Sequence, residues 1–410
     1  MDANVVRICF KNYLRVKFNI LPNKKISMAS EVFFSTLNAD PNHNLLQKLE
    51  RLVRKAGMDK IDFNGKFTAV KIHFGELGNM AYLRPDYAAV IIGIIKKLGG
   101  KPFLTDCNTL YSGWRSNAID HQDTAMKHGY TPFSTGAQII IADGLKGLDY
   151  VEVPIDGEYC KAPKIGTAIA EADIVVSINH VKGHEMAGFG GALKNLGMGC
   201  GSVAGKKEMH NASKPHIDVQ ECRGCGLCVK NCASHAISLV ERKAVINYDK
   251  CVGCGQCVAT CQYDGAVVDN DEQVDILNCK IAEYAKATLK GKPNFHINLI
   301  MDVSPECDCW GYNDLAVVPN IGMLASFDPV ALDCASADLV NGAPVIPNNN
   351  VLARNISNLD QNHDHENIDS HNHDHGDHWH IIHPDTNWRS CVEHARKIGL
   401  GSMDYKLITV

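Results

Sequence analysis

Short runs of β-branched residues alternate with longer stretches of helical periodicity along most of the chain. Continuous apolar runs of this length are typical of buried strands, whereas apolar residues at every third or fourth position are typical of amphipathic helices. The expected strands lie at 67–74, 101–107, 137–144, 172–180 and 295–304, and a first strand follows Met28. The clearest expected helices lie at 86–99, 276–291 and 328–341. This alternation predicts an α/β core with a largely parallel sheet.

Polar residues follow three of the expected strands, in the stretches KIHFGE (71–76), TDCN (105–108) and INHVKGH (178–184). Open parallel sheets bind their ligands at the carboxyl ends of the strands. Lys71 and His73 stand at positions i and i+2, which share one face of a strand. We therefore expect a pocket at this edge of the sheet, with His73 in its wall.

The α/β pattern stops near Lys214 and resumes near Val274. Insertion of a small module is tolerated where it enters at a surface loop. We therefore predict one α/β domain in two parts that are separated by a module rich in Cys and Gly. The predicted boundaries are 29–213 and 271–410 for the two parts and 214–270 for the module.

Composition is that of a soluble globular protein, with 45% hydrophobic and 21% charged residues among 410. No apolar run approaches the roughly 18–20 residues that a membrane span needs. The net charge of −5, with both signs interspersed, argues against the basic face that nucleic-acid binding requires. We expect a cytoplasmic protein that acts on neither nucleic acid nor membrane.

Residues 1–28 form a basic extension in which six Lys and Arg side chains face a single acid, Asp2. A signal peptide would have an apolar core followed by a cleavage site with small residues, and neither is present. We expect this extension to be either poorly ordered or the product of an upstream start codon.

Cysteine is unusually frequent in this chain, with 17 residues. The cytosol keeps thiols reduced, so these residues do not form a disulfide framework in such a compartment. Clustered Cys residues then indicate metal ligation or catalysis.

Two Cys-rich runs, CRGCGLCVKNC (222–232) and CVGCGQCVATC (251–261), repeat the pattern C-x2-C-x2-C-x3-C at an offset of 29. This is the spacing of bacterial two-cluster ferredoxins, in which the fourth Cys of each run ligates the other cluster. Zinc sites instead pair C-x2-C elements across a longer gap. The usual Pro after the fourth Cys is replaced by Ala233 and Gln262.

The spacing predicts two [4Fe-4S] clusters in an α+β module of the bacterial ferredoxin type, with each fourth Cys entering from the start of a short helix. The first predicted ligand set is Cys222, Cys225, Cys228 and Cys261. The second is Cys251, Cys254, Cys257 and Cys232.

Several stretches carry a family resemblance: VKIHFGE, INHVKGHEMAGFGGALKNLGMGC, the double Cys motif, IMDVSPECDCWGYNDLAVVPNIGMLASFDPVALD and HPDTNWRSCVEHARKIGLG. Together they resemble the domain of unknown function 362 family of Fe–S centre proteins, from about residue 29 to the C-terminus. The resemblance implies the split architecture and leaves the reaction open.

The stretch HEMAGFGGALK (184–194), followed by His210, resembles the active-site stretch of the nickel-pincer lactate racemases. In that family a His, a Lys ten residues on and a His sixteen beyond serve as catalytic base, cofactor attachment and nickel ligand. His184, Lys194 and His210 have the same spacings. The resemblance implies that these three residues, together with His73, are candidate catalytic residues.

Two further stretches contain residues of metal-binding type. In VSPECDCWGYND (303–314), Cys307 and Cys309 indicate either a third metal or redox-active thiol site or a turn with surface thiols. A His-rich loop at 361–383 holds eight of the 19 His, among which His371, His373 and His375 are candidate metal ligands. A flexible insertion with opportunistic metal affinity is the simpler interpretation of this loop.

We therefore expect an iron–sulfur protein that transfers electrons through two [4Fe-4S] clusters to or from a site in the α/β domain near His73, His184 and Lys194. Such a protein is an oxidoreductase with a redox partner protein and a small-molecule substrate. Two alternatives stay open. One is a non-catalytic ferredoxin-like electron carrier or redox sensor, and the other is an isomerase with a pincer-like cofactor.

Overall fold

The computed structural model describes most of the chain outside the N-terminal extension. The described residues are 29–111, 113–210, 215–232, 234–251, 253, 255–261, 263, 265–267, 271–348, 350–362 and 376–410. The predictions for residues 1–28, Cys254, His371, His373 and His375 therefore lie outside the described residues.

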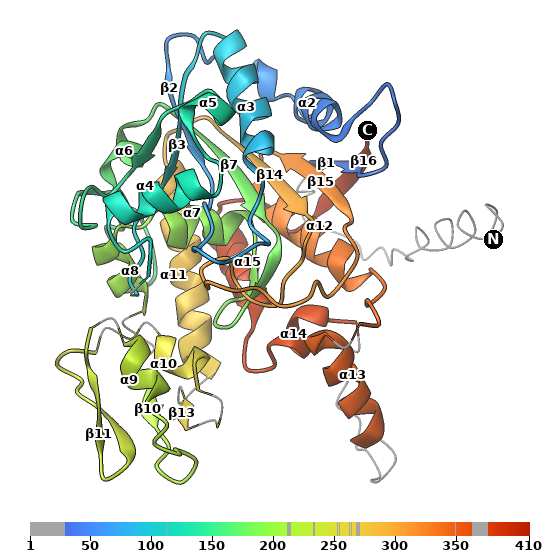
Figure 1. The fold of residues 1–410 in the computed structure, drawn as a ribbon. Helices are drawn as coiled ribbons and strands as arrows, with labels where there is room; N and C mark the ends of the chain where they lie inside the picture. Colours follow the sequence, from blue (N-terminus) through green and yellow to red (C-terminus); the bar gives the residue numbers. More distant parts are fainter. Residues whose placement is uncertain are drawn as a thin grey trace.

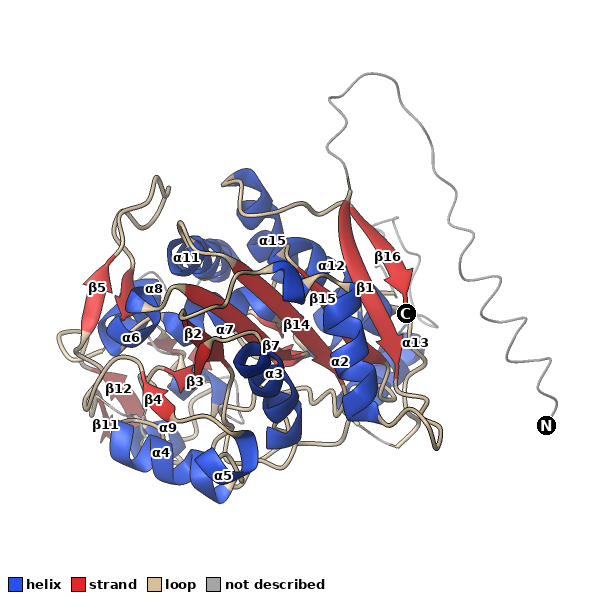
Figure 2. Ribbon diagram, turned by 90° about the horizontal axis from the view of Figure 1, so that it is seen from above, coloured by secondary structure: helices blue, strands red, loops and turns tan. Residues whose placement is uncertain are grey.

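A sheet of eight strands forms the centre of the molecule (Figures 1 and 2). In spatial order the strands are β16 (Tyr405–Thr409), β1 (Ser30–Thr36), β15 (Gly322–Ser326), β14 (Asn294–Ile300), β7 (Ile174–His180), β2 (Phe67–Lys71), β3 (Lys101–Asp106) and β4 (Ile139–Ile141). Neighbours pair in parallel except at β15, which is antiparallel to both β1 and β14. The predicted α/β fold with a largely parallel sheet is confirmed.

Helices cover both faces of this sheet, as Figure 2 shows. The helices α2 (Leu45–Lys55) and α3 (Pro85–Lys97) cover one face. The other face carries α7 (Ala192–Cys200), α11 (Asp271–Leu289), α12 (Pro329–Asn341) and α15 (Trp388–Lys397). Along β7, Val176 packs with the first group and Val175 with the second. A strand buried on both faces explains why this segment reads as an unbroken apolar run.

The remaining elements are short or lie at the periphery. They are η1 (Met58–Lys60), α4 (Ala118–Lys127), α5 (Pro132–Thr135), β5 (Tyr150–Glu152), β6 (Lys164–Gly166), α6 (Thr167–Glu171), β8 (Lys182–His184), β9 (Gly188–Gly190), α8 (Val203–His210), α13 (Val351–Asn362) and α14 (His378–Ile382). None of the described helices is long and apolar enough to span a bilayer.

Three expected strands end clearly earlier than their apolar runs indicate. β2 stops at Lys71, β4 at Ile141 and β14 at Ile300, whereas we expected 74, 144 and 304. The chain leaves β2 for a loop in which Gly75 adopts a φ of +81°, a conformation that glycine adopts without steric cost. His73 therefore lies in this loop, and the prediction that it shares a strand face with Lys71 is wrong.

The Cys-rich segment adds no described strand to the central sheet. It contains β10 (His216–Ile217), α9 (Leu227–Asn231), β11 (Ile237–Val240), β12 (Lys243–Ile246), α10 (Gln256–Ala259) and β13 (Ala266–Val267). β10 pairs with β13 and β11 with β12, both antiparallel. We call residues 215–267 the cysteine module; Figure 1 shows it below α8 and α11.

The two halves of the cysteine module repeat the same local backbone. Gly226 and Gly255, 29 residues apart, have φ angles of +78° and +72° and stand immediately before α9 and α10. Cys232 and Cys261 follow the ends of these helices. The prediction that each fourth Cys enters from a helix start is therefore wrong, because each helix contains the third Cys of its run and ends before the fourth.

A buried carboxylate fixes the start of α7, the helix that carries Lys194. Asp333, on α12, accepts the backbone N–H groups of Ala192 and Leu193 at 2.7 and 2.8 Å. It also accepts the side-chain amide of Asn298 on β14 at 2.8 Å. Any side chain at position 191 would meet the carboxylate, because a Cβ on Gly191 would lie 2.3 Å from Asp333 Oδ1.

Burial raises the pKa of Asp333 to about 6, although the hydrogen bonds from Asn298, Leu193 and Ala192 act in the opposite direction. The carboxyl is therefore mostly ionised at neutral pH. An anionic side chain at a helix N-terminus is stabilised by the first-turn N–H groups and by the helix dipole.

We predict that Asp333→Ala lowers the free energy of unfolding by about 3 kcal/mol, because it leaves three buried N–H donors without an acceptor. Urea unfolding followed by circular dichroism measures this loss. Asp338→Ala is the matched control on the same helix: Asp338 is exposed and bonded to Tyr405 Oη, so its loss should cost less than about 1 kcal/mol. Equal effects of the two substitutions would contradict the capping role.

Candidate functional site

The carboxyl ends of β2, β3, β7 and β14 lead into loops around one cavity. The residues proposed from the sequence as catalytic, His73, His184, Lys194 and His210, all line it. His73 comes from the loop after β2 and His184 from the end of β8, and the other two come from α7 and the end of α8. The structure thus brings together residues up to 137 positions apart in the chain.

A network of buried charges forms the wall on the β2–β3 side. Lys71 Nζ lies 2.9 Å from Asp106 Oδ1, and Arg115 Nε lies 3.1 Å from Glu76 Oε2. Arg115 Nη1 is also 3.2 Å from His73 Nε2. Burial and the guanidinium of Arg115 hold the pKa of His73 well below its usual range, so this imidazole is neutral.

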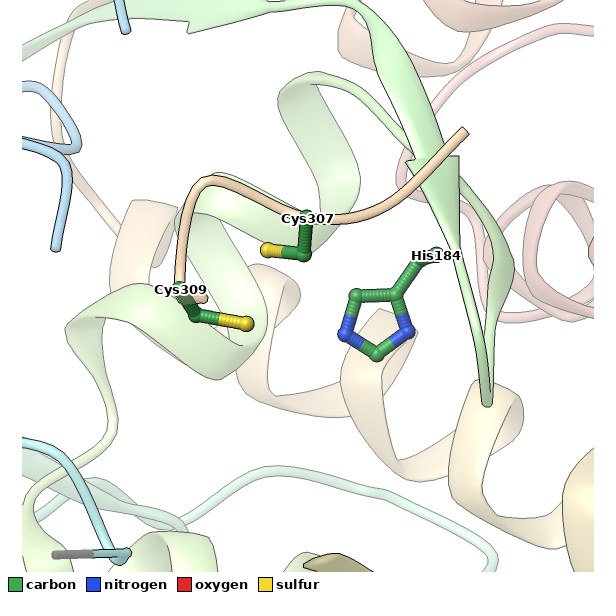
Figure 3. A group of neighbouring side chains, drawn as sticks. All are labelled: His184, Cys307 and Cys309. Atoms are coloured by element: carbon green, nitrogen blue, oxygen red, sulfur yellow. The ribbon is translucent and has the colours of Figure 1, made fainter. Parts of the chain in front are cut away.

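The opposite wall holds two thiols and an imidazole. One nitrogen of His184 and the Sγ atoms of Cys307 and Cys309 all lie within 4.8 Å of one another, and Figure 3 shows the three side chains turned toward a shared space. Cys307 is fully buried, and Lys194 Nζ lies 3.5 Å from its sulfur. The sequence left open whether these thiols lie on the surface; the structure buries Cys307 and places Cys309 at the cavity wall.

The aspartate between the two cysteines anchors their loop. The carboxylate of Asp308 is buried, accepts His180 Nδ1 at 2.9 Å and lies 3.3 Å from Lys182 Nζ. Its backbone carbonyl accepts the N–H of Glu76 at 2.8 Å. The Asp308 side chain is thus fixed by the chain after β7, with buried Cys307 on one side of it and Cys309 at the cavity wall on the other.

Hydrogen bonding and charge favour a thiolate at Cys307. The hydrogen bond from Cys309 is the strongest influence that holds the pKa of Cys307 well below its usual range, and Lys194 and His184 act in the same direction against burial. The same hydrogen bond raises the pKa of Cys309 well above its usual range. The hydrogen bond between the two side chains thus favours a thiolate at Cys307 over one at Cys309.

The hydrogen bonds of His184 bear on whether this group holds a metal ion. His184 Nδ1 accepts the backbone N–H groups of Met186 and Ala187 at 3.1 and 3.0 Å. A neutral imidazole then carries its proton on Nε2 and presents a donor to the thiols. A metal-bound His instead donates its second ring nitrogen to an acceptor. The arrangement therefore fits a hydrogen-bonded thiolate better than a third metal site.

Lys194 and His210 differ in charge. Burial by itself lowers the pKa of Lys194, but the thiols of Cys307 and Cys309 and the carboxylate of Glu185 raise it overall, so its ammonium persists. Burial lowers the pKa of His210 to about 3, with His184 and Lys194 as further causes. His210 is thus a neutral imidazole at the cavity wall.

Within the cysteine module, one small cavity is lined by all four members of the first predicted ligand set. They are Cys222, Cys225, Cys228 and Cys261. Gly265 allows the close approach of the chain there, because a Cβ at this position would lie 2.7 Å from the Cα of Cys222. This geometry is compatible with the predicted arrangement, in which the fourth Cys of each run ligates the cluster of the other run. Of the second set, Cys232, Cys251 and Cys257 are described.

The cysteine module also forms part of the main cavity. Gly255 and Gln256, which lie between the second-run Cys254 and Cys257, line it together with His184 and Lys194. The contact is direct, because a Cβ on Gly255 would lie 2.4 Å from Met186 Sδ. The second cysteine run therefore faces the same space as the candidate catalytic residues.

Sequence reasoning missed two residues of this site, Arg115 and Asp308. Arg115 lies in an irregular loop, and no motif marks it. Asp308 stands between two cysteines, and an acid in such a place reads as an ordinary turn residue. An acidic residue placed directly between two cysteines is the signal that would have identified Asp308.

Residues 68–338 match the sequence family described as domain of unknown function DUF362. This range includes the cavity and the cysteine module. The chain belongs to this family. Comparison of this DUF362 protein with curated protein sequences found no match.

Two solved structures have a remote likeness to the DUF362 chain. The lactate racemase apoprotein from Thermoanaerobacterium thermosaccharolyticum has 12% identity and a TM-score of 0.29, over 69% of this chain and 53% of that chain. A protein from Thermotoga maritima has 14% identity and a TM-score of 0.31, over 68% and 54%. The chain thus spans about half the length of each. Scores this low carry no conclusion about activity.

We predict that Lys194→Gln in this DUF362 protein moves the pH midpoint of Cys307 alkylation to higher pH, because removal of the ammonium disfavours the thiolate. Iodoacetamide labelling followed by peptide mass mapping measures the rate at each pH. Lys206→Gln is the control, because Lys206 also lines the cavity but donates to Gly201 O. An unchanged midpoint in Lys194→Gln would show that Lys194 does not set the state of Cys307.

Proposed function

We propose that this protein is an iron–sulfur oxidoreductase. In this proposal the cysteine module holds two [4Fe-4S] clusters, and a small molecule binds in the cavity beside His184 and Lys194. The main support for the proposal is that Gly255 and Gln256 of the second cysteine run line the same cavity as His184 and Lys194.

The arrangement of cysteine ligands in the module is suitable for such clusters. Four cysteines surround one small cavity, and the glycines before α9 and α10 adopt the same left-handed backbone in both halves. Backbone N–H groups also point at the sulfurs: Ala244 donates to Cys222 Sγ at 3.4 Å and Ala236 to Cys232 Sγ at 3.2 Å. Hydrogen bonds of this kind tune the potential of a cluster. When bound, each cluster supplies one electron at low potential.

The charges of the cavity favour an anionic substrate. Its lining includes four cationic side chains, Arg115, Lys182, Lys194 and Lys206, against the carboxylates of Asp106 and Glu185. Among the described residues, Lys194 and Lys206 have no carboxylate within 4 Å. Two cations without a carboxylate partner in one cavity attract a carboxylate or phosphate group.

The residues that line the cavity have different roles in this proposal. Lys194 and Lys206 bind and orient the anionic group. Burial holds the pKa values of His73 and His210 well below their usual range, so both imidazoles stay neutral and offer the substrate hydrogen bonds rather than proton transfer. Glu76 holds Arg115 in place through an ion pair and through the N–H of Trp114 at 2.7 Å.

A second candidate function is the isomerase with a covalently attached cofactor. The observation that favours it is that His184, Lys194 and His210, whose spacings prompted the idea, line one cavity. In this case Lys194 would carry the cofactor, and the cysteine module would serve maturation or regulation. The non-catalytic carrier is less favoured, because a docking domain has no need of a cavity with neutral imidazoles and buried cations.

We predict about eight iron and eight sulfide per chain in anaerobically purified protein, as two [4Fe-4S] clusters require. Cys222→Ala should remove about half of both, because it removes a ligand from one predicted set only. Iron and acid-labile sulfide assays, together with the visible absorption spectrum, make the measurement. Zinc in place of iron, with no visible absorption, would contradict the proposal.

We further predict that the intact mass of the denatured anaerobic protein equals that of the unmodified polypeptide, since cubane clusters are lost on denaturation. Mass spectrometry of the wild type and of Lys194→Ala tests this. An added mass that is present in the wild type and absent from Lys194→Ala would favour the isomerase instead. His184→Ala is the control, because it alters the cavity and leaves the lysine in place.

A further inference from the structure

We propose that Cys307 and Cys309 are a redox-active dithiol that cycles to a disulfide and exchanges two electrons with the cysteine module. The module's part in this rests on the proposed function. The dithiol itself rests on the geometry of the loop after β14.

The two sulfurs are already neighbours. They lie within 4.8 Å of each other, and Figure 3 shows the two side chains turned toward each other. The N–H of Trp310 donates to Cys307 O at 3.1 Å, which closes a tight turn around Asp308 and Cys309. A disulfide joins sulfurs about 2.05 Å apart, so closure requires the two thiols to rotate toward each other within this turn.

The backbone of the turn is held while the thiols stay free to react. Asp308 is bonded to His180 and Lys182 through its carboxylate and to Glu76 through its carbonyl. Gly183 supports the preceding residues, because its N–H donates to Ser304 O at 2.9 Å. A fixed backbone keeps the two sulfurs beside each other in either redox state, with Cys309 at the cavity wall.

The surroundings distinguish the two sulfurs. Cys307 lies beside the Lys194 ammonium and faces the Nε2–H side of His184, so it is suited to be the thiolate. Cys309 is partly exposed and lines the cavity. A thiolate next to a protonated thiol is the usual arrangement of attacking and resolving sulfurs in dithiol exchange.

The step balances with the electrons that the module would supply. Reduction of the disulfide takes two electrons and one proton. The Sγ–Sγ bond breaks, Cys307 is released as the thiolate beside Lys194, and Cys309 takes the proton. One electron from each of two clusters makes up the pair. Oxidation runs in reverse: the bond forms, two electrons leave and Cys309 gives up its proton.

The position of the dithiol connects it with the module. Cys309 and Gly255 line the same cavity, and Met186, two residues after His184, packs on Gly255. The dithiol would collect two single electrons and pass them as a pair to a substrate in the cavity. This arrangement would convert one-electron transfer into two-electron chemistry.

The test uses the full-length anaerobic holoprotein, equilibrated with mixtures of reduced and oxidised dithiothreitol. After an acid quench and labelling with N-ethylmaleimide in denaturant, the peptide that contains both cysteines is weighed. We expect it to change from unlabelled to doubly labelled in one two-electron transition. Cys309→Ser should give a singly labelled peptide at every ratio. Cys334→Ala, which removes a buried thiol of α12, should keep the transition.

A second arm tests the electronic link, with reduced methyl viologen as the electron donor. We expect Cys257→Ala to slow reduction of the disulfide at least tenfold while the dithiothreitol transition stays unchanged. Circular dichroism and an iron content near four per chain show that this variant is folded. An equal rate in wild type and Cys257→Ala would overturn the link to the module.

Two outcomes separate this proposal from the proposed function. Full iron content together with a doubly labelled peptide at every ratio would overturn only the proposal of a redox-active dithiol. One zinc per chain that is lost in Cys309→Ser would do the same. Absence of iron would overturn the proposed function, while a two-electron transition in the same protein would still support the Cys307–Cys309 pair.

Discussion

The site depends first on one buried carboxylate at the start of α7. Asp333 ties this helix to α12 and, through Asn298, to β14. This anchor fixes where α7 begins and therefore where Lys194 and Asn195 stand, one turn into the helix. Asn195 in turn contacts Lys71 and Asn179 across the ends of β2 and β7. A charge buried in this way is tolerated because backbone N–H groups satisfy it.

The second constraint is electrostatic. The cavity gathers lysines and an arginine where the parallel strands end, and the chain balances them in different ways. Lys71 and Arg115 are neutralised by carboxylates of the same wall, so they are structural as well as charged. Lys194 is balanced by a thiol instead. A thiolate is a nucleophile and can be oxidised, whereas a carboxylate is not readily oxidised, so this pairing differs chemically from the ion pairs of Lys71 and Arg115.

Much of the architecture could be predicted from the sequence, because apolar periodicity reports burial directly. The segment 172–180 became β7. The rule that ligands gather at strand ends pointed to His73 and His184, the resemblance in spacing added Lys194 and His210, and all four line one cavity. The predicted ends of β2 and β14 were too late, because an apolar run continues into loops that are themselves buried. Arg115, Asp308 and the contact of Met186 with Gly255 depend on which loops meet in space, and no local pattern encodes that meeting.

The most direct test of the account is a crystal structure of the anaerobically purified protein with anomalous diffraction data at the iron edge. The account predicts two iron sites in the cysteine module, one among Cys222, Cys225, Cys228 and Cys261, and one beside Cys257 at the wall of the cavity that holds Lys194. Zinc at these cysteines, or a metal ion bound between His184, Cys307 and Cys309, would contradict it.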